Sequence, residues 1–164
     1  MSKKVDIKDL VEKIAKLSRE RMSQAQVVSI EDLKRAAPPV RPKTLLIIED
    51  DETVRKALER IFLDENYKLL LARGAADLSG LLTDAPIDLI LLDIGLPWVN
   101  GFELAEMMKA HKDLKRVPIV FISGQKDLAV VKRGFAIGAH DFITKPFDVG
   151  NVKKTVQTLL ALNS

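Results

Sequence analysis

The sequence predicts an α/β fold in which a five-stranded parallel sheet is covered by helices on both faces. Between residues 44 and 162, five short apolar runs alternate with segments of helical periodicity. The runs are continuously apolar, as in strands that are buried on both faces. Apolar residues make up 47% of the 164 residues, which is enough to form a core of this size.

The first half of this region contains three predicted strands and two helices. Residues 44–48 form an apolar run that is too short for a helix and ends at a carboxylate. Residues 67–72 and 88–92 are the next strands, and a helix over 75–82 lies between them. The helix after the first strand is predicted by one apolar face, which consists of Val54, Ala57, Leu58, Ile61 and Phe62.

The second half continues the alternation. Residues 101–110 predict a helix, and residues 117–122 predict a strand whose Pro118 lies near its start, where a missing N–H is tolerated. A helix over 126–137 precedes a short strand at 140–143. The last helix is predicted by an apolar face that consists of Val149, Val152, Val156, Leu159 and Leu160.

Charge divides the chain into two parts. Residues 1–43 hold 11 basic and 6 acidic groups, whereas residues 44–164 hold 15 basic and 17 acidic groups. The change coincides with residues 36–43, where three prolines in five positions oppose a helix and favour an extended linker. We therefore expect a basic helical arm with a Pro-rich linker over 1–43 and a compact domain over 44–164.

Composition excludes several classes of protein. The chain has no cysteine, which removes disulfide scaffolds, cysteine metal sites and thiol nucleophiles. No run approaches 18 apolar residues, and the first residues carry mixed charge rather than an apolar signal segment. We expect a cytoplasmic protein without a membrane span.

Polar residues follow four of the predicted strands. Glu49, Asp50 and Asp51 follow the first strand, Asp93 the third, Ser123 the fourth and Lys145 the fifth. The carboxyl ends of parallel strands are where α/β sheets bind ligands. Carboxylates without histidine or cysteine suit a hard cation such as Mg²⁺, which leaves coordination positions open for a phosphoryl oxygen. Asp93 could then act as a nucleophile that forms an aspartyl phosphate, assisted by the lysine and the hydroxyl.

Taken singly, these residues have simpler interpretations. Asp51 can equally cap the next helix, Ser123 can be a turn residue, and Lys145 can be a solvated surface lysine. Asp93 ends a buried apolar run, where a carboxylate is costly unless it is paired. The joint pattern, with each polar group after a different strand, favours a site.

Four segments carry a resemblance to a known family. They are LLIIEDDE at 45–52, LLDIGLP at 91–97 with Gly101 following, FISG at 121–124 and GAHDFITKPF at 138–147. In this order and spacing, residues 44–162 resemble a response-regulator receiver domain of two-component signalling, of the CheY-like superfamily. The resemblance implies a flavodoxin-like, doubly wound sheet with strand order 2-1-3-4-5, and a cis peptide bond between Lys145 and Pro146.

The resemblance also implies roles for the site residues. Asp93 would accept a phosphoryl group from a histidine kinase or phosphotransfer protein, and Ser123 and Lys145 would hold the phosphoryl oxygens. Movement of Ser123 would let Phe142 rotate inward and change the face made by the fourth helix, fifth strand and fifth helix, where partners dock. The residues implied to hold Mg²⁺ are Asp50 directly, Glu49 through water, Asp93, and Gly95 through its backbone carbonyl.

Departures from the family pattern are modest. Leu96 stands where the family often has Met, and Phe142 stands where Tyr is commoner. Gly95 and Gln125 occupy the positions that tune dephosphorylation, so the lifetime of the phosphate stays open.

The resulting hypothesis is a phosphorylation-dependent switch that changes partner binding or oligomerisation, with no DNA-binding output domain expected in this chain. It would catalyse only its own phosphorylation and dephosphorylation and is not expected to be an enzyme. One alternative is a receiver-fold scaffold that binds its partner constitutively. Another is a haloacid-dehalogenase-type phosphatase, which would need a second acid at the position of Gly95.

The arm predicts an amphipathic helix over residues 5–21 and a second helical turn over 29–33. A helix this short must pack on something, because it is marginal in isolation. It could dock on its own domain or on a second copy, which is favoured, or bind a separate partner. Nucleic acid or a membrane surface is disfavoured, because acidic residues interleave with the basic ones and the arm has no aromatic residue. The stripe consists of Ile7, Leu10, Val11, Ile14 and Leu17.

Overall fold

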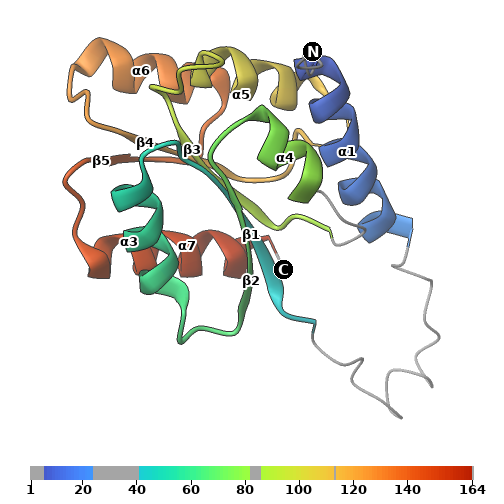
Figure 1. Cartoon of the computed structure of the whole chain (residues 1–164), viewed down its shortest axis with the longest axis horizontal. Coiled ribbons are helices and arrows are strands. Elements are labelled where there is room, and N and C mark those ends of the chain that lie inside the picture. The colour runs from blue at the N-terminus through green and yellow to red at the C-terminus, as the bar shows by residue number, and fades with distance from the viewer. Residues whose placement is uncertain (1–5, 24–40, 82–85, 113, 164) are drawn as a thin grey trace.

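The computed structural model describes residues 6–23, 41–81, 86–112 and 114–163, and Figure 1 shows the arrangement of their helices and strands. The predicted turn at 29–33 and most of the predicted linker lie outside these residues. In chain order the elements are α1 (Ile7–Ser23), β1 (Lys43–Ile48), α3 (Glu52–Phe62), β2 (Tyr67–Ala72), α4 (Ala75–Leu81), β3 (Leu89–Asp93), α5 (Gly101–Ala110), β4 (Ile119–Ser123), α6 (Leu128–Ile137), β5 (Asp141–Thr144) and α7 (Val149–Leu162).

The five strands form one parallel sheet in the order β2-β1-β3-β4-β5, which confirms the predicted fold class and strand order. At the carboxyl edge, Asp93 is paired with Ile122 and Ser123 with Thr144. Two of the predicted site residues are therefore the last residues of neighbouring strands, which places them at one edge.

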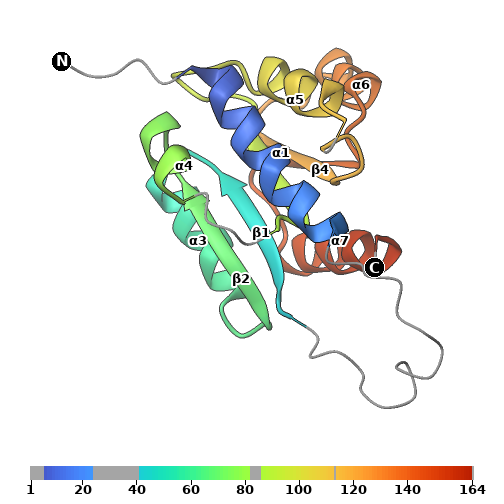
Figure 2. The same ribbon diagram turned by 90° about the vertical axis from the view of Figure 1, so that its right-hand side faces the viewer.

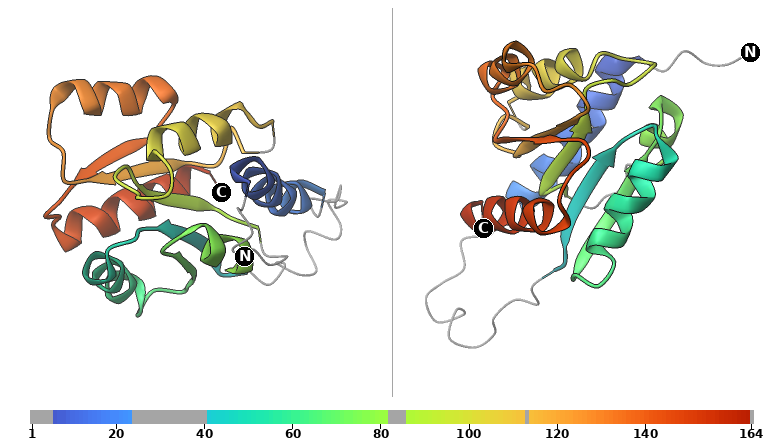
Figure 3. Two further views of the ribbon diagram at one scale, coloured as in Figure 1. Left: turned by 45° about the horizontal axis from the view of Figure 1, so that its top comes forward. Right: turned by 90° about the vertical axis from the view of Figure 1, so that its left-hand side faces the viewer.

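Helices cover both faces of the sheet, and the strands lie between two helical layers (Figure 3). Alternate residues of β1 face opposite layers: Leu45 belongs to the apolar cluster with α3 and α7, and Leu46 to the cluster with α4, α5 and α1. Because side chains alternate along a strand, both sets must be apolar when both faces are covered. This explains the continuous apolar runs in the sequence.

One strand begins later than its apolar run. β4 starts at Ile119 and not at residue 117, because Pro118 has no N–H for the ladder. The carbonyl of Pro118 still accepts a hydrogen bond from the backbone N–H of Ile90 at 2.9 Å.

Asp51 caps α3. Its carboxylate accepts a hydrogen bond from the backbone N–H of Val54 at 3.0 Å, and the backbone of Asp51 is extended, as expected for an N-cap. Of the two interpretations of this residue, the structure therefore supports the helix cap.

Helix α1 packs on the chain's own domain, between α4 and α5 (Figure 2). Its apolar side chains belong to the same cluster as Leu78 of α4 and Met108 of α5. Two polar contacts flank them: Lys13 Nζ donates to Ser79 Oγ at 3.0 Å, and His111 Nε2 lies 2.9 Å from Glu12 Oε2. Of the possibilities considered for the helix of the arm, the structure therefore shows docking on the chain's own compact domain. The buried residues of the helix are Leu10, Val11, Ile14, Ala15 and Leu17.

An ion pair between the half-exposed Arg41 and the buried Asp88 ties the start of β1 to the start of β3, at the end of the sheet opposite to the predicted site. Asp88 is 1% exposed and accepts two hydrogen bonds from the guanidinium of Arg41, at 2.8 and 3.1 Å. It also accepts one from the backbone N–H of Thr44 at 2.8 Å.

Within the described part of the chain, no helix is long and apolar enough to cross a membrane.

Candidate functional site

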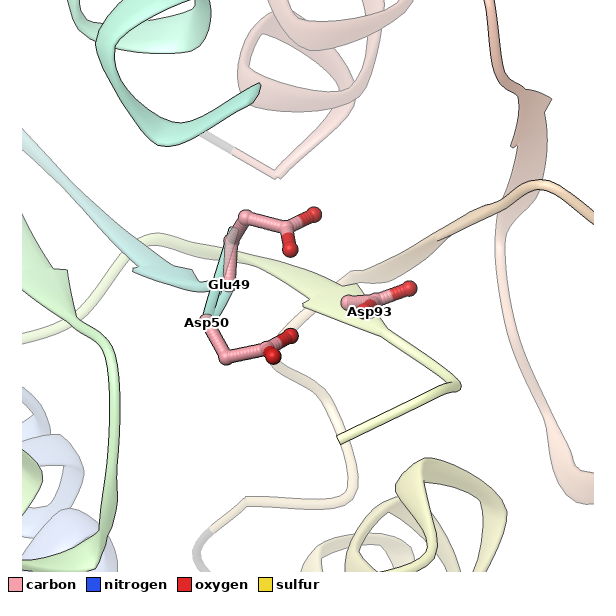
Figure 4. A group of neighbouring side chains, drawn as sticks. All are labelled: Glu49, Asp50 and Asp93. Carbon is pink, nitrogen blue, oxygen red and sulfur yellow. The ribbon is translucent and has the colours of Figure 1, made fainter. Parts of the chain in front are cut away.

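Three carboxylates from two neighbouring strands meet at the carboxyl edge of the sheet (Figure 4). Glu49 and Asp50 directly follow β1, and Asp93 ends β3. One oxygen atom of each carboxylate lies within 4.8 Å of the others. The structure thus brings together the three side chains that the sequence assigned to a metal site, while Asp51 in the same loop is used as a helix cap.

Lys145, which follows β5, reaches the same carboxylates. Its Nζ lies 2.7 Å from Glu49 Oε2 and 3.4 Å from Asp93 Oδ1. The backbone N–H of Lys145 donates to the carbonyl of Ser123 at 2.7 Å, and the peptide bond to Pro146 is cis, as predicted. The lysine is thereby held between the two buried acids.

Burial strongly affects the pKa values of Glu49 and Lys145. Glu49 is 1% exposed, and burial raises its pKa, with the charge of Asp93 adding to that rise and Lys145 opposing it. Burial alone would lower the pKa of Lys145, but the hydrogen bond and charge of Glu49, together with Asp93, raise it overall. The lysine therefore stays charged, and its positive charge offsets part of the repulsion between the two buried acids.

The donor set fits Mg²⁺. The three carboxylates offer only oxygen atoms, the ligands that this hard cation prefers. One lysine compensates only one of their negative charges, so a dication would complete the neutralisation. Asp50 is exposed, so this side of the cluster is open to solvent.

The loop after Asp93 packs against the start of α5. A Cβ atom on Gly101 would lie 2.4 Å from the carbonyl oxygen of Asp93 and 2.6 Å from the Cα of Ile94, so only glycine fits. The backbone N–H of Gly101 donates to the carbonyl of Ile94 at 3.0 Å. Gly95 lies beside the carboxylate, since a Cβ there would be 3.8 Å from Asp93 Oδ2.

Ser123 and Phe142 occupy neighbouring strands. Ser123 is buried, and its Oγ accepts a hydrogen bond from the backbone N–H of Gln125 at 3.0 Å. The ring of Phe142 is half-buried and tilted against that of Phe121, with centroids 6.2 Å apart. Gly134 of α6 lies close to both rings, because a Cβ there would be 3.1 Å from Phe121 and 3.3 Å from Phe142.

Sequence reasoning missed one residue of this region, Arg55. Its Nη1 donates to the carbonyl oxygens of Glu49 and Asp50, each at 3.1 Å. The only signal in the sequence is a basic residue one turn into the helix that follows the acids, which is also the pattern of an ordinary solvated arginine.

The chain is similar to known signalling proteins. Residues 45–157 match the family described as the response regulator receiver domain. TorR, the TorCAD operon transcriptional regulatory protein of Escherichia coli O157:H7, is 32% identical over 119 residues, which cover 73% of this chain and 50% of TorR. Across the first curated relatives, the match covers between 28% and 53% of their own length. Helix α1 lies outside the family match.

Solved structures give the same result. The receiver domain of HemR from Leptospira biflexa, in its non-phosphorylated form, is 30% identical, with a TM-score of 0.66 over 74% of this chain and 97% of that chain. A CheY-like receiver domain protein from Methanospirillum hungatei JF-1 is 26% identical, with a TM-score of 0.65 over 74% of this chain and 96% of that chain. The family match covers residues 45–157, more than half of the chain, and the strand order agrees with it. The chain therefore belongs to the response regulator receiver domain family.

Proposed function

We propose that this chain is a phosphorylation-dependent switch in which Asp93 accepts a phosphoryl group from a histidine kinase or phosphotransfer protein. The observation that carries the proposal is the meeting of Asp93, Glu49 and Lys145 at the carboxyl edge of a receiver-type sheet. A half-buried lysine between two buried acids has a charge that a transferred phosphoryl group can use.

In the proposed reaction, an Asp93 carboxylate oxygen attacks the phosphorus of the donor phosphohistidine. A P–O bond forms as the P–N bond breaks, and the imidazole leaves and regains a proton. Lys145, 3.4 Å from Asp93 Oδ1, is placed to balance charge on the phosphoryl oxygens, and Ser123 to bind one of them.

Mg²⁺ would be held by Glu49, Asp50, Asp93 and the backbone carbonyl of Gly95. When bound, it would reduce the repulsion between the anionic donor and the carboxylates. The chain would catalyse only its own phosphorylation and dephosphorylation, in keeping with receiver domains as signalling modules and not as enzymes.

The proposed output is a change in partner binding or oligomerisation through the face made by α6, β5 and α7. Ser123 and Phe142 would relay the state of Asp93 to this face. Its support in the structure is the exposure of large apolar side chains on α6 and α7, which include Leu128, Phe135 and Val149.

We also propose that residues 44–164 act as the receiver and that residues 1–43 modulate it from the docked position of α1. We propose a cytoplasmic location for the chain.

Intact mass of the full chain, after incubation with a small-molecule phosphodonor and Mg²⁺, tests the acceptor. The native chain should gain one phosphoryl group and Asp93→Asn none. Asp51→Asn is the matched control, because it alters an acid of the same region that caps α3 and keeps a capping side chain. It should be phosphorylated like the native chain.

Two results would contradict the proposal. Equal phosphorylation of the native chain and Asp93→Asn would place the acceptor elsewhere. If neither gains mass, beryllofluoride with Mg²⁺ is added and the fluorescence of Trp98 is followed, since Trp98 lines the same groove as Gly95 and Gln125. No response there as well would leave the constitutive scaffold as the function.

A further inference from the structure

Arg55 holds the backbone of the loop that carries two of the three acids. This loop, residues 49–51, joins β1 to α3, and Arg55 lies in the first turn of α3. Its Nη1 donates to the carbonyl oxygens of Glu49 and Asp50 at 3.1 Å each. A terminal guanidinium nitrogen carries two N–H groups, so a single nitrogen can serve both carbonyls.

From these contacts we infer that Arg55 is a positioning residue for the magnesium site, because it fixes the backbone from which Glu49 and Asp50 project. The inference rests on the proposed function of that site. Arg55 touches neither Asp93 nor a place for the phosphoryl group in any described contact, so it acts through the loop.

The remaining hydrogen bonds of the loop show why one side chain matters this much. The backbone N–H of Glu49 donates to the carbonyl of Ala72 at 3.0 Å, and that of Asp51 donates to Glu49 Oε1 at 3.0 Å. The carbonyl of Asp51 begins α3 by accepting from the backbone N–H of Arg55 at 2.9 Å. The carbonyls of Glu49 and Asp50 are thus the two loop acceptors that depend on the guanidinium.

Asp50 depends on this contact more than Glu49 does. The Glu49 carboxylate is fixed independently, by the N–H of Asp51 and by Lys145. Among the described residues, none forms a hydrogen bond or an ion pair with the Asp50 carboxylate, and Asp50 is exposed. The direction in which its carboxylate points is therefore set mainly by its backbone, which Arg55 holds.

The contribution of Arg55 is geometric more than electrostatic. The groups that shift the pKa of Glu49 after burial are Lys145, Asp93 and the N–H of Asp51. The charge of Arg55 acts instead on Asp51 and Glu52, whose pKa values it helps to lower. Replacing a residue that orients metal ligands without touching the metal itself typically changes metal affinity by about 10- to 100-fold.

Calorimetric titration of the full chain with Mg²⁺ measures this effect. Arg55→Gln should bind Mg²⁺ about 10- to 100-fold more weakly than the native chain. Arg55→Lys keeps the charge but offers no planar guanidinium, so it should be weakened to a similar degree. Arg60→Gln removes the same charge from the exposed end of the same helix and should match the native chain. Asp50→Asn shows the loss expected when a ligand itself is removed.

Urea unfolding without Mg²⁺ accompanies each titration, so that a change in affinity is read only from folded protein. Native affinity in Arg55→Gln would overturn the inference. Full rescue by Arg55→Lys would overturn its geometric part and assign the effect to charge. If the native chain binds no Mg²⁺, both the proposed metal site and the role of Arg55 are contradicted. If the native chain binds Mg²⁺ and is phosphorylated on Asp93, as measured by intact mass, but Arg55→Gln binds Mg²⁺ equally well, only the role of Arg55 is contradicted.

Discussion

Replacement of Ile14 by alanine tests whether α1 is part of the folded domain in solution. Ile14 is fully buried in the cluster that joins α1 to α4 and α5. Truncation of a fully buried isoleucine to alanine typically costs about 2–5 kcal/mol, through lost transfer energy and the cavity that remains. For a loss of about 3 kcal/mol and a urea m-value of about 2 kcal/mol/M, the unfolding midpoint should fall by about 1.5 M.

The assay is equilibrium urea unfolding, followed by far-ultraviolet circular dichroism, of the native chain, Ile14→Ala and Lys16→Ala. Lys16 is exposed on the same helix, so its replacement should change the free energy of unfolding by less than about 0.5 kcal/mol. If α1 were detached, Ile14→Ala would remove no packing and would raise helix propensity by a few tenths of a kcal/mol. An unchanged or raised midpoint for Ile14→Ala would therefore refute the docking of α1.

Three further predictions concern stability and its dependence on pH. Asp88→Asn should lower the free energy of unfolding by about 1.5–3 kcal/mol, because it removes the charge that accepts the hydrogen bonds of Arg41 and Thr44. Arg41→Lys keeps the charge of the pair and should cost less in urea unfolding; a larger loss for Arg41→Lys would contradict the central role given to the Asp88 carboxylate. Gly101→Ala should lower the free energy of unfolding by about 1–3 kcal/mol, because the added methyl would lie 2.4 Å from the carbonyl oxygen of Asp93. Gly95→Ala has room for the methyl and should change this free energy by less than about 0.5 kcal/mol. Equal midpoints of the two variants in thermal unfolding would count against this reasoning. Burial lowers the pKa of Lys109 from 10.5 to about 8 in the native chain. Between these two pH values Lys109 is protonated in the unfolded chain but neutral in the native chain, so the free energy of unfolding rises as pH increases from about 8 to about 10. Relative to Lys109→Met, the native chain should become more stable from about pH 8 to about pH 10 in urea titrations, and a constant difference would argue against the shift.

The sheet could be predicted from the sequence because its strands are buried on both faces. Such strands leave continuous apolar runs, and the alternation with amphipathic segments fixed the fold class. Boundaries were less exact, because they depend on single backbone groups. β4 begins after Pro118, and β3 extends to Asp93, whose backbone still pairs with Ile122 although its side chain is polar.

The carboxylate cluster was predictable because polar side chains at strand ends must share one edge of a parallel sheet. The two uses of Asp51 could not be separated, since a ligand and a helix cap require the same residue type at the same place. Arg55 escaped prediction because its partners are backbone carbonyls, which leave no mark on the sequence. Likewise, the stripe of α1 indicated that something covers it, but the identity of the covering surface depends on α4 and α5, which lie far along the chain.

The position of α1 has a consequence for the order in which the chain folds. Lys13 contacts a residue 66 positions later, and Glu12 contacts one 99 positions later. At synthesis rates of about 5–20 residues per second, α1 is synthesised roughly 5–20 s before α5, one of the two helices on which it packs. Alone it is only marginally helical, so its apolar stripe has no partner until α5 has formed. Because its partners α4 and α5 lie far along the chain, docking of α1 cannot precede the formation of these two helices, whereas the β–α units close over short separations.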